Sequence, residues 1–136
     1  MAKICTDIEQ SQKLIELGID VNTADIFYTT FYGKVSKELP LPKEVYDILK
    51  YPYPGDKCVP AWSLSALLKL IPPYLGEFKD GIDFGFSKAM NRKWYSAHYI
   101  KINDNGLASF VKTVTGDTAI DAAFEMICWL KKNHKI

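Results

Sequence analysis

The feature that most constrains the fold is the last third of the chain, from Leu107 to Asn133, where a β-branched run leads through a Thr-Gly-Asp-Thr turn into an amphipathic segment. Thr118 supplies an N-cap hydroxyl and Asp121 an acid three residues later, a near version of a capping box. Apolar residues then recur at helical spacing: Ile120, Ala123, Phe124, Ile127 and Leu130. One stripe of this helix must therefore be buried, most economically against the sheet that the preceding strands supply.

Three consecutive strands are predicted ahead of that helix. In the first, Ile82 to Phe86, apolar and polar residues alternate, which is typical of a half-buried strand. Trp94 to Ile102 and Leu107 to Val114 follow, joined by the turn residues 103–106, Asn-Asp-Asn-Gly. The pattern predicts a three-strand antiparallel meander closed by the C-terminal helix, and hence an α+β fold.

Two further helices are expected in the first half. Thr6 followed by Glu9 reads as a capping box, and Gly18 ends the helix that follows it. Trp62 and Ser63 open the central helix, in which the residues from Leu64 to Ile71 complete the apolar pattern i, i+3, i+4, i+7, and Pro72-Pro73 stops it. We expect the N-terminal, central and C-terminal helices to pack on the meander.

The segment between those two helices is less regular. Ile26 to Val35 is dense in aromatic and β-branched residues and predicts a strand, which we expect at an edge of the same sheet to give four strands. Residues 39–60 hold five of the seven prolines and predict a long surface connection, with one or two helical turns at 43–49. The whole chain, 1–136, is expected to be a single globular domain.

Composition excludes several classes of protein. The 17 basic and 16 acidic residues leave a net charge of +1, which makes a nucleic-acid partner unlikely and provides no attraction to an anionic membrane. The first residues contain no apolar run of the secretory type, and the stretch from Leu64 to Ile71 is far below the roughly 20 residues that span a bilayer. These features predict a cytoplasmic protein.

The three cysteines, Cys5, Cys58 and Cys128, lack the paired spacings of a zinc site or a redox dithiol, so we expect no metal and no cofactor. Cys58 follows Lys57, whose ammonium favours a thiolate, and His98 is the one histidine that could fold against it as a base. An enzyme built on Cys58 and His98 is therefore one alternative, although no catalytic motif accompanies the pair.

Aromatic residues are more suggestive. Four of them lie in or beside the proline-rich segments: Tyr51, Tyr53, Trp62 and Tyr74. Aromatic anchors in loops are enriched at protein interfaces, so we expect this set to bind a protein partner or a second copy of the chain. The alternative is that these rings cover the core from outside.

A second surface is predicted at the tip of the first hairpin, residues 88–98. Basic and aromatic side chains cluster there, which is the composition that stacks a base and holds a phosphate. The candidate ligand-binding residues are Arg92, Lys93, Trp94 and His98. A small-ligand or nucleotide-binding protein is the alternative function that this hairpin predicts.

Four blocks of the chain resemble a family of small uncharacterised proteins encoded by gut bacteria and their phages or prophages: residues 5–11, 17–20 with 23–25, 60–68 and 122–130. The chain departs from the family most at 35–54. The resemblance implies a mobile-element setting and carries over no functional residue. With the loop aromatics, it leads to the hypothesis of a non-enzymatic binding or accessory protein of a mobile element.

Overall fold

The computed structural model describes residues 3–28, 30–31, 34–35, 41–42, 59–88 and 93–136. The chain forms two compact units, Met1–Ala66 (unit 1) and Leu67–Ile136 (unit 2). Their boundary falls inside helix α3 (Leu64–Leu70) and not in the proline-rich segment. Helices and antiparallel sheets are both present, which confirms the α+β class, while the expectation of a single domain stays a prediction.

Helix α1 (Ile8–Glu16) opens unit 1, and its N-cap is Asp7 where the sequence predicted Thr6. The Asp7 carboxylate accepts the Gln10 N–H at 2.8 Å, and the Gln10 side chain accepts the Asp7 N–H at 3.1 Å. The predicted box is thus displaced by one residue. The physical reason is that the Thr6 hydroxyl is used in the core of unit 1, as described below.

The end of α1 is as predicted. Gly18 has φ +89°, a conformation that costs glycine little and other residues more. The Gly18 N–H donates to the Ile15 carbonyl and the Ile19 N–H to the Leu14 carbonyl, both at 3.0 Å, which is the Schellman arrangement. A short 3₁₀ helix, η1 (Val21–Thr23), follows.

The strand predicted at 26–35 is divided among three short strands: β1 (Ile26–Tyr28), β2 (Thr30–Phe31) and β3 (Lys34–Val35). The expectation that it would join the meander is wrong, because β1 pairs antiparallel with β4 (Leu41–Pro42) and β5 (Val59–Ala61), and β2 pairs with β3. The proline-rich segment thus supplies two edge strands, a position that tolerates a missing ladder donor. The helical turns predicted at 43–49 lie outside the described residues.

Thr6 joins the parts of unit 1. Its N–H donates to the Trp62 carbonyl and its hydroxyl accepts the Trp62 N–H, at 2.9 and 3.0 Å. The same hydroxyl is 2.8 Å from the Ser11 hydroxyl, and the Thr6 carbonyl accepts the Tyr28 hydroxyl at 2.8 Å. Each of these polar groups therefore has a partner within the buried network. Cys5, Tyr28 and Ala61 form the apolar part of the same core.

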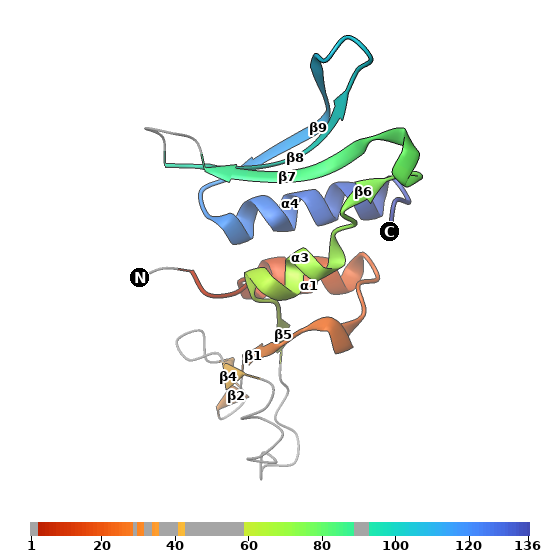
Figure 1. Ribbon diagram of the computed structural model, residues 1–136. Helices are drawn as coiled ribbons and strands as arrows, with labels where there is room; N and C mark the ends of the chain where they lie inside the picture. Colours follow the sequence, from red (N-terminus) through yellow and green to blue (C-terminus); the bar gives the residue numbers. More distant parts are fainter. Residues whose placement is uncertain (1–2, 29, 32–33, 36–40, 43–58, 89–92) are drawn as a thin grey trace. The chain divides into compact units, whose positions relative to one another are not determined.

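Unit 2 is a four-stranded antiparallel sheet with a helix on one face (Figure 1). Its strands are β6 (Tyr74–Leu75), β7 (Ile82–Lys88), β8 (Tyr95–Ile102) and β9 (Ala108–Gly116), paired in chain order, with the 3₁₀ helix η2 (Phe78–Asp80) before β7. The three predicted strands correspond to β7, β8 and β9. The fourth strand is β6, and its neighbour Pro73 accepts the Phe84 N–H at 2.9 Å.

Helix α4 (Ala119–Lys132) packs on β8 and β9. The Thr118 hydroxyl accepts the Asp121 N–H at 3.1 Å and donates to its carboxylate at 2.8 Å, which confirms the predicted cap. The five stripe residues predicted for this helix are all buried. Leu67 in α3 and Ile71 directly after it are buried as predicted, but Leu68 is exposed, so the buried stripe of this helix is narrower than expected.

Candidate functional site

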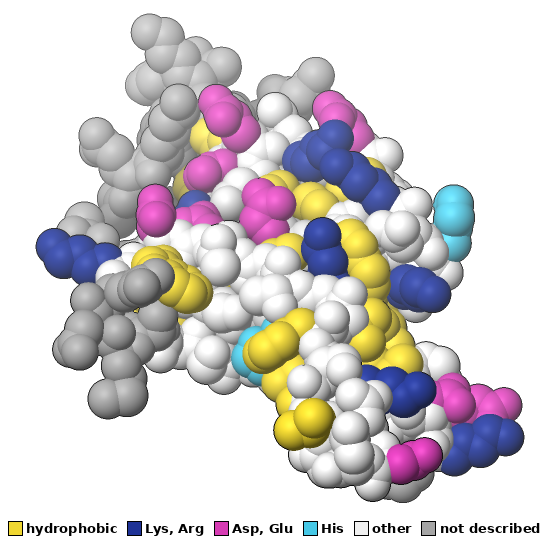
Figure 2. Space-filling model, turned by 90° about the horizontal axis from the view of Figure 1, so that it is seen from above, with side chains coloured by type: hydrophobic (Ala, Val, Ile, Leu, Met, Phe, Trp, Pro, Cys, Tyr) yellow, Lys and Arg dark blue, Asp and Glu magenta, His cyan; other side chains and the backbone are white. Residues whose placement is uncertain are grey.

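Large apolar side chains are exposed at the far end of the β8–β9 hairpin. We call this set the hairpin cluster: Ile102, Leu107, Phe110 and Val111, with exposed fractions of 60%, 66%, 63% and 45%. Figure 2 shows hydrophobic side chains at the surface on the face of the unit 2 sheet opposite α4, with a histidine beside them. Single exposed apolar residues are ordinary, but four from one hairpin are a feature to explain.

The sheet face to which this cluster belongs follows from contacts with α4. Tyr99 and Lys112 both lie against Trp129 of the helix, at 6.4 and 5.8 Å. Because successive side chains of a strand alternate, the residues on either side of Tyr99 in β8 point to the other face, which we call the outer face. Ile102 lies on the outer face for this reason, and Phe110 does because it pairs with Ile100.

A β-bulge turns Phe110 outward. Tyr99 pairs with Lys112 but Ile100 pairs with Phe110, so Val111 is the extra residue in β9. In an unbroken strand Phe110 and Lys112 would share a face, and Phe110 would lie under α4. Bulges re-aim side chains in this way and occur often beside functional sites. The exposure of the Phe110 ring is therefore built into the strand geometry.

His98 lies between this ring and the next strand. Its imidazole meets the Phe110 ring edge-on, with centroids 5.6 Å apart and planes at 90°. On the other side it covers Gly85, where a Cβ atom would collide with Nε2 of the imidazole. Burial lowers the pKa of His98, so the ring is neutral at neutral pH and adds to an apolar surface.

The ligand site predicted at the hairpin tip is only partly within the described residues. Arg92 lies outside them, Lys93 is exposed, and Trp94 is half-buried directly before β8. His98 stands four residues further along an extended strand, roughly 14 Å from Trp94. The structure thus places His98 with Phe110 and Gly85, away from the other predicted ligand residues.

The four aromatic residues predicted to bind a partner do not form one surface within the described residues. Tyr51 and Tyr53 lie outside the described residues, as does Cys58, so the Cys58–His98 pair stays a prediction. Trp62 is fully buried in unit 1, and its indole N–H donates to the Thr23 hydroxyl at 2.9 Å. Its ring therefore serves the core. Tyr74 in β6 of unit 2 is 37% exposed.

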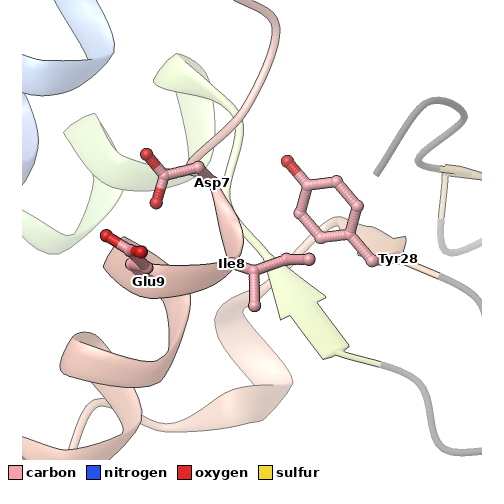
Figure 3. A pocket seen from close by; sticks show the side chains of 4 residues that line it. All are labelled: Asp7, Ile8, Glu9 and Tyr28. Carbon is pink, nitrogen blue, oxygen red and sulfur yellow. The ribbon is translucent and has the colours of Figure 1, made fainter. Parts of the chain in front are cut away.

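A cavity of about 300 Å³ in unit 1 is lined by Asp7, Ile8, Glu9 and Tyr28 at the start of α1 (Figure 3). Its polar groups have structural tasks, because Asp7 caps the helix and the Tyr28 hydroxyl is bound to Thr6. Burial raises the pKa of Cys5, which lies 3.3 Å from the Tyr28 hydroxyl, and burial raises the pKa of Tyr28 as well. Neither group is activated as a nucleophile.

No family model, curated protein or solved structure matches the chain. None of the described helices has both the length and the apolarity that crossing a membrane requires. In the same part of the chain, no three His, Cys, Asp or Glu side chains are grouped so that they could hold a metal ion.

Proposed function

We propose that this chain is a non-enzymatic binding module, an accessory protein of a mobile element, that holds a protein partner on the hairpin cluster. The observation that supports this most is the 63% exposure of Phe110, a ring directed to solvent by a bulge. Aromatic residues, phenylalanine among them, are enriched at protein interfaces compared with the rest of the protein surface. The mobile-element setting rests on the resemblance of the four sequence blocks.

The surroundings of Phe110 support the same proposal. Ile102 lies on the same face, and the His98 ring holds the phenyl group edge-on, so little side-chain entropy is lost when a partner covers it. Asp83, exposed on β7, pairs with Ile100 and supplies a polar rim to the outer face. An apolar centre with a polar rim is the usual anatomy of a protein interface.

The test is Phe110→Ser, compared with Ile4→Ser as a matched control. Ile4 is 59% exposed and belongs to unit 1, so both variants remove a similarly exposed apolar group. The partner is captured from a lysate of the encoding organism with the wild-type chain, purified, and titrated against all three proteins. We expect Phe110→Ser to weaken binding by about thirtyfold or more and Ile4→Ser to leave it unchanged.

Retention of full affinity by Phe110→Ser would contradict the proposal, as would an equal loss in Ile4→Ser. Unfolding curves of both variants show whether either substitution disturbs the fold. Both sites are well exposed, so stability changes within about 0.5 kcal/mol are expected.

A further inference from the structure

Strand β9 is the open edge of the unit 2 sheet. Within the described residues, β8 pairs with one side of β9 and no strand pairs with the other. An edge of this kind presents unpaired N–H and C=O groups to any strand that can align with it. Thr113 and Thr115 are exposed along this edge, and Val114 between them is half-buried.

We infer that the partner of this edge is a second copy of the chain, with β9 of one copy antiparallel to β9 of the other about a two-fold axis at Val114. In this register Val114 faces its own copy, Thr113 faces Thr115, and Lys112 faces Gly116. In a strand, the N–H and C=O groups of every second residue point to the same edge. Each pair in this register joins two residues whose groups point the same way, so the unpaired groups of one β9 meet those of the other. The two threonine pairs are a favourable cross-strand combination.

The bulge and the lysine, which often protect edge strands, do not block this register. The bulge at Val111 lies outside the five-residue stretch from Lys112 to Gly116, where β9 is regular. The Lys112 ammonium lies 5.8 Å from the centre of the Trp129 ring, on the α4 side of the sheet, so it does not occupy the place of the incoming backbone. Glycine is the residue that Lys112 would face, so no like charge opposes it in the partner strand.

Charges on α4 complement this arrangement. The side of α4 that is not buried carries Asp121, Glu125, Trp129 and Lys132. It runs beside β9, because Trp129 lies under Lys112 and a Cβ at Gly116 would come within 2.7 Å of Asp121. Since Lys112 of one copy faces Gly116 of the other, each Lys112 ammonium approaches the partner's Asp121 carboxylate, twice in the dimer. The two Glu125 side chains near the axis can turn to solvent.

The two helices fit beside each other. Neighbouring strands lie about 4.8 Å apart, and α4 lies over β8 and β9, so the axes of the two α4 helices would be separated by roughly 10 Å. That is the ordinary packing distance of two helices. The dimer joins both sheets into one and places the two hairpin clusters on the same outer face.

This inference does not depend on the proposed function, and it is tested by oligomeric state alone. The molar mass of the full chain is measured by sedimentation equilibrium over a concentration series. Three double variants at the exposed threonines are compared with it: Thr113→Lys with Thr115→Lys, Thr113→Glu with Thr115→Glu, and Thr113→Lys with Thr115→Glu.

The register predicts each result. In the double-lysine and double-glutamate chains, residue 113 of one copy faces a like charge at residue 115 of the other, twice per dimer. The dimer affinity of each should therefore be at least about tenfold lower than that of the wild type. The mixed variant opposes lysine with glutamate twice and should dimerise as well as the wild type. An equimolar mixture of the double-lysine and double-glutamate chains should form a heterodimer.

A wild-type chain that is monomeric at every concentration would overturn the inference, as would a dimer that all three double variants leave intact. A double-lysine chain that stays monomeric when mixed with the double-glutamate chain would refute the register. The unfolding transition of each variant confirms that the fold is retained, since the substituted side chains are exposed.

Discussion

At the scale of single residues, the outer face depends on a glycine that makes room for a histidine. Gly85 pairs with His98, and the imidazole occupies the space that any side chain at position 85 would need. This explains why a strand interior carries glycine despite its entropic cost. The ring that fills the space in turn supports Phe110.

Gly85→Ala should therefore destabilise the protein by about 1–3 kcal/mol, because the new methyl group displaces the imidazole. In a His98→Ala background the same substitution should cost much less, since the space is then empty. Urea unfolding of the four proteins in this cycle measures the coupling. Additive effects of the two substitutions would show that the close contact is not what excludes a side chain at position 85.

The protonation of His98 gives a pH dependence of stability. Burial lowers its pKa from the ordinary value of 6.5, so the unfolded chain takes up a proton at a higher pH than the folded chain. The His98 contribution is complete above about pH 6.5 and decreases as the pH falls toward the folded-state pKa. Unfolding free energies of wild type and His98→Asn between about pH 7.5 and 5 measure the difference. Parallel curves would contradict this assignment.

At the scale of elements, the start of α1 shows two adjacent residues with separate tasks. Asp7→Ala removes an exposed N-cap and should cost about 1 kcal/mol. Thr6→Ala leaves the Trp62 N–H without its acceptor inside the core and should cost about 1–3 kcal/mol. Thr6→Ser, which keeps the hydroxyl, is the control and should recover most of that loss. A larger effect at Asp7 than at Thr6 would argue against this division.

The elements that the sequence predicted well are those specified by neighbouring residues. The cap at Thr118, the stop at Gly18 and the strands β7 to β9 each depend on signals within a few residues. The pairing of β1 with β5 and the use of Thr6 by Trp62 depend on residues far apart in the chain. Local patterns carry no information about such partners, which is why they predict a cap at Thr6 and place the early strand in the wrong sheet.

The hairpin cluster was missed for a related reason. The pattern of loop aromatics predicts a partner-binding role for Trp62, whose ring is fully buried in unit 1. A signal was nevertheless present in β9: Phe110 and Val111 are adjacent apolar residues, and Lys112 follows in the phase that faces α4. A break in alternation of this kind indicates a bulge, and it identifies Phe110 as the residue turned outward.

At the scale of the whole molecule, the two units differ in how far along the chain their contacts reach. In unit 2 each strand pairs with the next one along the chain and α4 follows β9 directly, so strand pairing joins elements that are consecutive in the sequence. In unit 1 the core joins residues 6 and 62, which are 56 positions apart. Low contact order favours rapid folding, and closing a long loop has an entropic cost.

The Thr6–Trp62 hydrogen bonds therefore set an order of events during synthesis. Until position 62 has left the ribosome, α1 has no β5 to pack against, and the buried Thr6 ahead of α1 has no backbone partner. The core residues of unit 1 that have already been synthesised stay exposed to solvent until then. The strands of the later half can pair as each hairpin emerges, whereas the core of unit 1 cannot close before residue 62 is available, which lengthens the time for which this part of the nascent chain is open to chaperones and proteases.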